Sequence, residues 1–349
     1  MLNNFSPETG LYKRKPDFNN LLKVLNCDVP ARPTLFEFFM NPPLYKRLIA
    51  NLDQPLPPDS PDWLLQARAF EVAGYDYCTV SIPGFEFTRS EHSEEKTISW
   101  NEGWMITDRE SFDSYAWPDP DNADYEHFNT VAEALPSGMK IITCGPCGVL
   151  ENVIKLVGYE NLCLMLMDDE QLVYDIFEQV GSRLVEFYSR AVKYDAVGAC
   201  ISNDDWGFKT QTMLAPEDMR KFVFPWHKQI VNTCHEAGKP VILHSCGYFN
   251  EIIDDVIDDM KFDGRHSYED GIVPVEEAYD KYSRRIAVMG GIDVDFICRH
   301  SPEEVYERSR KMLKRSAVNG AYALGSGNSI PEYVPPEGYI AMIRAALDE

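Results

Sequence analysis

The stretch Lys239–Gly247, with the sequence KPVILHSCG, decides the predicted fold of this chain. Its apolar run PVIL is bounded by glycines and is too short for a helix, so it predicts a strand buried on both faces, as in a parallel sheet. Side chains alternate along a strand, so His244 and Cys246 point the same way at its carboxyl end. Two candidate metal ligands therefore converge on one spot, and the alternative is a buried histidine beside a buried cysteine.

Strands and helices are predicted to alternate outward from this segment along the chain. Besides the His244 strand, apolar runs predict strands at 32–40, 75–82, 139–144, 196–203, 262–266, 285–289 and 321–324. Helical patterns between them occupy 63–73, 125–135, 148–157, 168–194, 216–237, 250–260, 275–282 and 302–315, with a last helix near the carboxyl terminus. Eight alternations without a break in composition predict an α/β fold of the (β/α)₈ TIM-barrel type, whose strand ends face one mouth.

One barrel domain is expected to span residues 1–349, with two additions to the barrel itself. Residues 1–31 read as a lead-in whose short helical pattern, 18–25, packs against the main body. Residues 97–117, TISWNEGWMITDRESFDSYAW, are rich in aromatic residues and too irregular for a barrel helix. We expect them to form a hairpin inserted after the second strand, over the mouth, where their rings wall a ligand pocket or cap the core.

Composition and charge exclude several classes of function. The 349 residues include 33 Lys and Arg against 56 Asp and Glu, which gives a net charge of −23, and such an acid excess repels nucleic-acid phosphates and anionic membrane surfaces. Apolar runs fall short of the roughly 20 residues of a membrane span, and the polar start lacks a signal peptide's apolar core. The nine cysteines lack the spacing of a disulfide scaffold and suit reduced thiols, so we expect a cytoplasmic protein.

Polar residues follow several of the predicted strands at the mouth. Asp204 and Asp205 end the fourth strand, and adjacent carboxylates there indicate either a site or a helix cap, about equally. Glu269 follows the sixth strand, Asp293 the seventh and Ser326 the eighth. These groups, with His244 and Cys246, are expected to share the barrel mouth.

Two further positions remain open to more than one interpretation. Glu37 lies inside the apolar first strand, where a surface-facing edge position is the simpler interpretation until a partner is found. Cys144 and Cys147 form a C-x-x-C spacing after the third strand, but the intervening Gly-Pro is ordinary turn chemistry, so a redox role is disfavoured and a metal role is secondary.

With these residues in place, the chain resembles the uroporphyrinogen decarboxylase superfamily from RPTLFEFF to GSGNSIPEYVP. The HSCG motif followed by SYED is similar to one branch, the zinc-dependent corrinoid-protein:thiol methyltransferases. The resemblance implies that His244 and Cys246 are zinc ligands, that Glu269 is an acidic ligand, and that a separate corrinoid protein is the partner. That branch has a further cysteine after the eighth strand, and here Gly325 and Ser326 stand in its place.

The decarboxylase branch fits the sequence less well. The resemblance implies an arginine-rich segment after the first strand and an aspartate after the second, but this chain has FFMNPPLYKR and SIPGFEF there. The predicted function is therefore methyl transfer between a corrinoid carrier and a small-molecule acceptor such as a zinc-bound thiol. Asp204 or Asp205 is expected to support His244 or contact substrate, with Glu269 also at the catalytic centre. A decarboxylase-like lyase and a non-catalytic binding barrel are the alternatives.

Overall fold

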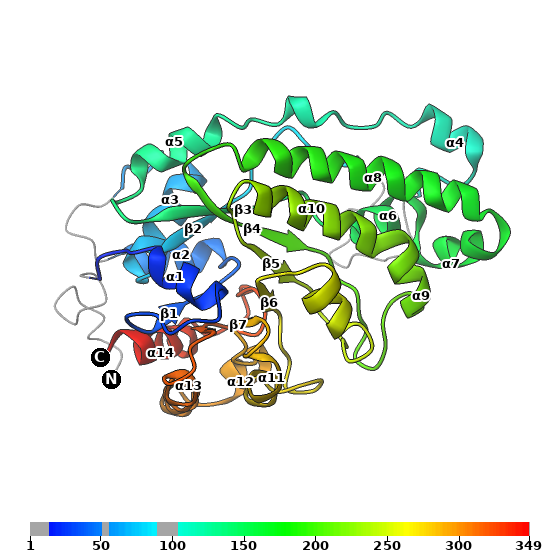
Figure 1. Cartoon of the computed structure of the whole chain (residues 1–349). Helices are drawn as coiled ribbons and strands as arrows, with labels where there is room; N and C mark the ends of the chain where they lie inside the picture. The colour runs from blue at the N-terminus through cyan, green and yellow to red at the C-terminus, as the bar shows by residue number, and fades with distance from the viewer. Residues whose placement is uncertain (1–13, 51–55, 89–103, 349) are drawn as a thin grey trace.

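The computed structural model describes residues 14–50, 56–88 and 104–348 (Figure 1). Eight parallel strands form one sheet in the order β1-β8-β7-β6-β5-β4-β3-β2, flanked by helices, which confirms the (β/α)₈ class. The strands are β1 Thr34–Leu35, β2 Tyr77–Val80, β3 Lys140–Cys144, β4 Val197–Asn203, β5 Val241–His244, β6 Gly264–His266, β7 Ala287–Met289 and β8 Tyr322–Leu324.

Every predicted strand is present, although each is shorter than its apolar run. The helices are α1 Asn19–Leu25, α2 Pro42–Ile49, α3 Asp62–Val72, α4 Arg109–Ser114, α5 His127–Ala134, α6 Val149–Val157, α7 Tyr159–Asp168, α8 Glu170–Ala191, α9 Pro216–Asp218, α10 Phe224–Glu236, α11 Val275–Tyr282, α12 Val294–Arg299, α13 Pro302–Ser316 and α14 Pro336–Leu347. Three short helical turns are η2 Pro120–Asn122, η3 Met219–Val223 and η4 Asp255–Asp259. The last two are π-helical, so the helices predicted at 216–237 and 250–260 are locally wider than an α-helix.

The sheet curls until its first and last strands pair, but β1 and β2 do not share a ladder among the described residues. The side chain of Tyr77 connects the two strands instead. The Glu37 N–H donates to the Tyr77 hydroxyl oxygen, and that hydroxyl donates to the Glu37 carbonyl, each at 2.6 Å. A buried tyrosine thus satisfies backbone groups that a neighbouring strand satisfies elsewhere in the sheet.

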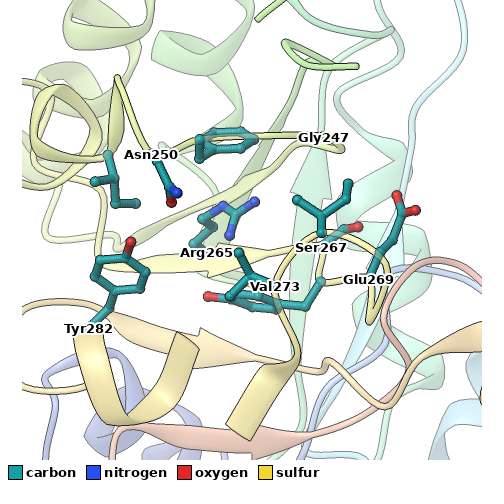
Figure 2. A pocket seen from close by; sticks show the side chains of 11 residues that line it. Gly247, Asn250, Arg265, Ser267, Glu269, Val273 and Tyr282 are labelled. Atoms are coloured by element: carbon teal, nitrogen blue, oxygen red, sulfur yellow. The ribbon is translucent and has the colours of Figure 1, made fainter. Parts of the chain in front are cut away.

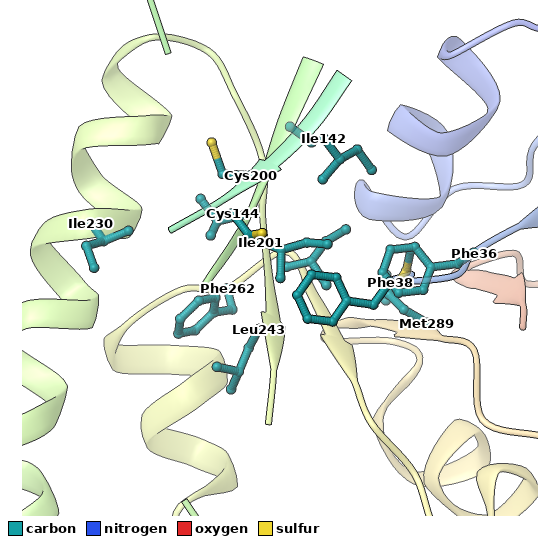
Figure 3. Close-up of a cluster of buried hydrophobic side chains, with 14 of the residues drawn as sticks. Phe36, Phe38, Ile142, Cys144, Cys200, Ile201, Ile230, Leu243, Phe262 and Met289 are labelled. Carbon is teal, nitrogen blue, oxygen red and sulfur yellow. The ribbon is translucent and has the colours of Figure 1, made fainter. Parts of the chain in front are cut away.

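The strands carry apolar residues on both faces, as the PVIL run predicts. Figure 3 shows Ile142, Ile201 and Leu243 from neighbouring strands among aromatic rings that include Phe36 and Phe38. All five side chains are buried, and each removes apolar surface worth roughly 1.5–3 kcal/mol. The core is therefore a packed interior, and the chemistry is confined to the strand ends.

The lead-in packs against the amino-terminal ends of the strands. Leu21 and Val24 of α1 are fully buried. A Cβ added at Gly198, early in β4, would lie 2.5 Å from the Phe18 ring, so only glycine permits this close approach. The described part of the lead-in, from residue 14, closes the end of the barrel opposite the mouth.

The hairpin predicted over 97–117 is not confirmed. Residues 97–103 lie outside the described part of the chain, and residues 104–117 contain the short helix α4 and no strand. The helix begins at Asp108, whose side chain accepts the Ser111 N–H at 2.8 Å in a capping box. The Leu156 carbonyl accepts the N–H groups of Met105 and Ile106 and holds this segment against α6. Within the described ranges, no helix is both long and apolar enough to cross a bilayer.

Candidate metal centre at the barrel mouth

Asp205, His244 and Cys246 converge at the carboxyl ends of β4 and β5. One ligand atom from each lies within 4.8 Å of the other two. Asn203 pairs with His244 in the parallel ladder, so the residues that follow the two strands run side by side. The Cys246 N–H donates to Asp205 Oδ1 at 2.8 Å, which fixes the carboxylate beside the thiol. Sulfur, nitrogen and oxygen donors at this spacing form a set that zinc accepts.

The glycine of the HSCG motif makes this arrangement sterically feasible. Gly247 has a φ of +98°, a left-handed conformation that favours glycine. A Cβ there would lie 2.2 Å from the carbonyl carbon of Gly207, in the loop that carries Asp205. The Gly207 N–H also donates to the Cys246 carbonyl at 3.2 Å. Gly247 thus lets the two ligand-bearing loops lie against each other.

A second histidine fixes the proton position on His244. His244 pairs with His266 in the β5–β6 ladder, and their Nδ1 atoms are 2.7 Å apart. His266 Nε2 lies 3.0 Å from the Ser326 carbonyl, an acceptor only, so this nitrogen carries the proton. His266 Nδ1 must then accept, and His244 Nδ1–H donates to it. The lone pair of His244 is left on Nε2, which is the state a metal ligand requires.

Burial gives the three ligands properties that suit a cation. Burial, aided by the positive charge of Arg265, lowers the pKa of His244 to about 3, so the ring is neutral at any physiological pH. Burial and the Asp205 carboxylate raise the pKa of Cys246 well above its ordinary value. Burial also raises the pKa of Asp205. A cation between thiol and carboxylate reverses both shifts, so binding releases a proton and strengthens as pH rises.

We expect His266→Phe to weaken zinc binding by about 10- to 100-fold, because the phenyl ring fills the space but offers His244 Nδ1–H no acceptor. Competition with a chromophoric chelator measures this affinity. His300→Phe, at an exposed histidine stacked on Phe296, is the control and should retain wild-type affinity. Equal zinc affinities for wild type and His266→Phe would show that His266 does not prepare His244 for metal binding.

The structure gives Ser326 a different role from the one its position suggested. Ser326 is fully buried and its hydroxyl donates to Glu37 Oε1 at 2.8 Å, so it is not a member of the ligand group. Asn328, two residues further on, donates from Nδ2 to Cys246 Sγ at 3.2 Å. This turn therefore supplies a hydrogen bond to the sulfur and a carbonyl to His266.

The structure explains why an acid lies in the apolar first strand: Glu37 is hydrogen-bonded to Ser326, in the turn after β8. The surface-edge interpretation is wrong, because the side chain is fully buried and also accepts the Ser326 N–H at 3.3 Å. Burial raises its pKa to about 8, against an ordinary value near 4.3. The acid is thus neutral in the folded protein at pH 7 and lies behind the His266–Ser326 contact.

The raised pKa of Glu37 predicts a pH-dependent stability. Between about pH 4.5 and 8 the unfolded chain has lost this proton and the folded protein retains it, so the free energy of unfolding falls as pH rises, by up to about 1.4 kcal/mol per pH unit. Glu37→Gln removes this contribution and should be more stable than wild type at pH 8 but not at pH 4.5. Urea unfolding at several pH values measures the difference. Glu151, whose pKa is also raised to about 8, contributes equally to both proteins. Parallel pH profiles would contradict the prediction.

Asp204 belongs to a supporting network. Its Oδ2 accepts the Leu150 N–H at 2.9 Å and its Oδ1 accepts the Glu151 N–H at 2.8 Å, at the start of α6. His227 Nε2 lies 2.8 Å from Oδ2, and its Nδ1 is 3.0 Å from the Ser202 hydroxyl. Asp204 is fully buried, so of the two predicted acids it is Asp205 that joins the ligand group. Asp204 therefore holds the start of α6, and Asp205 lies in the candidate ligand group.

Glu269, predicted as the third ligand, is not among the three side chains of this group. The acid follows β6 by three residues and borders two cavities, of about 20 Å³ (Figure 2) and about 640 Å³. Asp293 is committed to the start of α12, where it accepts the Phe296 N–H at 2.9 Å and also the Asp270 N–H at 2.8 Å.

The C-x-x-C cysteines line another cavity at the mouth, of about 530 Å³. Cys144 Sγ lies 3.1 Å from the Ser81 hydroxyl, and Cys147 contacts the Lys155 ammonium. Neither thiol joins a three-residue ligand group among the described residues. All nine cysteines of the chain are free thiols.

Comparison with known proteins supports the resemblance seen in the sequence. The family model described as uroporphyrinogen decarboxylase (URO-D) matches residues 105–348. A relative named uroporphyrinogen decarboxylase from Geobacter sulfurreducens is 25% identical over 189 residues, 53% of this chain and 52% of the relative. Its namesake from Geobacter metallireducens is 28% identical over 144 residues, 40% of this chain and 39% of the relative. The chain thus spans about half the length, or less, of these curated relatives.

A solved structure, a methyltransferase from Methanosarcina mazei, has the same fold. It covers 97% of this chain and 98% of its own length with a TM-score of 0.71, at 14% identity. The family model covers well over half of the residues, and the solved structure covers nearly all of the fold. The chain belongs to the uroporphyrinogen decarboxylase family.

Proposed function

We propose that this protein is a zinc-dependent methyltransferase that moves a methyl group from a methylated corrinoid to the sulfur of a small thiol. The observation that carries the proposal is the group Asp205, His244 and Cys246, in which a histidine relay leaves His244 Nε2 free to bind a metal. The group lies at the carboxyl ends of the barrel strands, where catalytic residues of this fold are found.

The residues of the site account for activation of the acceptor. Zinc, when held by the three side chains, supplies a Lewis acid that makes a bound thiol lose its proton at neutral pH. Asn328 donates a hydrogen bond to Cys246 Sγ and so stabilises negative charge on that ligand. His244 remains neutral because burial, aided by the positive charge of Arg265, lowers the pKa of its ring. With zinc bound, two anionic ligands and one neutral ligand would keep the acceptor sulfur electron-rich.

The methyl transfer itself is a nucleophilic displacement. The acceptor sulfur forms a bond to the methyl carbon, the cobalt–carbon bond breaks with its electron pair left on cobalt, and the thiol proton goes to solvent. We propose that the corrinoid is presented by a separate carrier protein, as the HSCG and SYED resemblance implies. The cell compartment proposed is the cytoplasm, where nine free thiols remain reduced.

The assay is demethylation of methylcobalamin, followed by its visible spectrum, with zinc-loaded and zinc-free protein and a panel of thiols. Demethylation that requires both zinc and a thiol is the expected result. Uroporphyrinogen is the parallel substrate, because the curated relatives carry the decarboxylase name. Decarboxylation without demethylation would favour a lyase, and neither activity would favour a binding protein.

A further inference from the structure

The outer face of α7 carries a row of apolar side chains that are exposed to solvent. Residues 162–167 of this helix, LCLMLM, are apolar without interruption. Leu162 and Met165 are buried against the body of the protein, whereas Leu164 is 62% exposed and Met167 86% exposed. Cys163 is exposed as well. A helix that is apolar all round is normally covered on every side, so the outer face of α7 lacks a covering partner among the described residues.

Two exposed aromatic side chains extend this face at the amino-terminal end of α7. Trp104 lies against Gly158, where an added Cβ would be 2.1 Å from the indole Nε1. The Phe208 ring meets the Tyr159 ring edge-on, with 5.8 Å between the centroids. We define the α7 patch as Trp104, Cys163, Leu164, Met167 and Phe208. It includes four of the nine large hydrophobic side chains that are exposed in the described ranges, and such clustering marks an interaction surface.

The α7 patch reaches the rim of the barrel mouth. Phe208 lies three residues after Asp205, in the loop that follows β4. Its carbonyl accepts the Tyr248 N–H at 2.9 Å, just after the HSCG motif. The Tyr159 hydroxyl donates to the Met213 carbonyl at 2.6 Å and ties α7 to the same loop. Figure 1 shows α7 at the edge of the molecule, beside the start of α8, so a protein bound there would contact the loop that carries Asp205.

The charge around the α7 patch decides which kind of partner fits it. Residues 159–171, which form α7 and the first turn of α8, contain no lysine or arginine and four acids: Glu160, Asp168, Asp169 and Glu170. Lys221 contacts Glu170 and neutralises only part of this charge. A second copy of the chain would bring the same acids and a further net charge of −23, and an anionic membrane would bring phosphates, so both are repelled. A basic surface is attracted.

We propose that the α7 patch docks a second protein whose contact surface has an apolar centre bordered by lysine and arginine side chains. Leu164 and Met167 contact the apolar centre, and the unbranched methionine adapts to the shape of its partner. Trp104 and Phe208 offer ring faces to cations at the border. The acids of α7 and α8 select a basic partner over an acidic one and speed its association. The inference does not depend on the reaction at the metal centre, because the patch contains no residue of the ligand group.

The probe for this surface is a fluorescein-labelled amphipathic helical peptide of leucine and lysine, whose anisotropy is followed as the full chain is added. Wild type should bind it and should not bind a matched peptide in which glutamate replaces lysine. Leu164→Asp and Met167→Asp should each raise the Kd about 10-fold, because each places a charge in the apolar centre.

The matched control for these variants is Val318→Asp. Val318 is 83% exposed between α13 and β8, and its substitution makes the same change of net charge outside the patch. This variant should bind the peptide like wild type. Equal weakening by Met167→Asp and Val318→Asp, or no binding by wild type, would overturn the proposal.

Two further measurements test the other occupants of the α7 patch. Sedimentation equilibrium of wild type and Met167→Asp at one concentration should give equal masses. A larger mass for wild type would assign the patch to a second copy of the chain and overturn the proposal. Flotation with phosphatidylcholine vesicles should leave wild type in the aqueous fraction. Flotation of wild type that Met167→Asp abolishes would assign the patch to a membrane instead.

Discussion

Cys246→Ala is expected to reduce bound zinc from about one equivalent to less than a tenth of an equivalent and to abolish methyl transfer. Among the described residues three side chains form the ligand group, and Cys246 supplies its sulfur. Removal of a residue that merely orients a ligand weakens a metal site by 10- to 100-fold, so loss of a direct ligand should cost more. Elemental analysis after dialysis against a weak chelator measures the retained zinc.

The control for this variant is another thiol at the mouth. Cys298 lines the cavity of about 640 Å³ but is not part of the ligand group. Cys298→Ala should retain zinc and activity, which separates loss of a ligand from loss of a thiol in general. Equal zinc in wild type and Cys246→Ala would take the cysteine out of the site and with it the proposed mechanism.

Asp204→Ala is expected to destabilise the fold by about 3–5 kcal/mol. The change leaves the N–H groups of Leu150 and Glu151 without their acceptor and His227 without its buried partner. Each unsatisfied buried donor costs about 1–3 kcal/mol. Urea denaturation followed by far-ultraviolet circular dichroism gives the free energy of unfolding.

Asp205→Ala is the paired variant, one residue away. Asp205 is half-buried and accepts a single backbone N–H, from Cys246, so its loss should cost about 1 kcal/mol of stability. The same change should remove most of the bound zinc. The two acids therefore separate folding from metal binding. If Asp204→Ala were as stable as wild type but had lost its zinc, Asp204 would be the residue that binds metal.

The fold was predictable because its signals are local. Each buried strand is a short apolar run between turns, and the eightfold repeat identifies the barrel. The predictions failed at two short helices whose starts are set by a capping side chain and not by an apolar pattern. The helix α2 was not predicted, because it has only eight residues and begins with two prolines. The Asn41 side chain caps its start by accepting the Leu44 N–H. In the segment 104–117, a capping box selects a helix where the aromatic residues suggested a hairpin.

The sequence predicts which site residues lie together only where those residues are close in the chain. His244 ends β5 and Cys246 follows it by only two residues, so the sequence alone places them close together. Asp205 and His266 join them through the registers Asn203–His244 and His244–His266, which no local pattern specifies. A histidine at the end of the sixth apolar run was the available signal for His266. Glu37 and Ser326 are 289 residues apart in the chain, Asn328 and Cys246 are 82 apart, and the closed sheet brings each pair together.

Zinc X-ray absorption spectroscopy, with and without an acceptor thiol, observes the ligands of the metal themselves. The zinc-loaded protein should show one sulfur ligand at about 2.3 Å with the remaining nitrogen and oxygen ligands at about 2.0–2.2 Å. Addition of 3-mercaptopropionate should raise the count to two sulfurs, because the thiol enters the open position beside Cys246. A zinc site with no sulfur ligand, or a sulfur count unchanged by the thiol, would contradict a metal centre built by Asp205, His244 and Cys246 to activate a thiol.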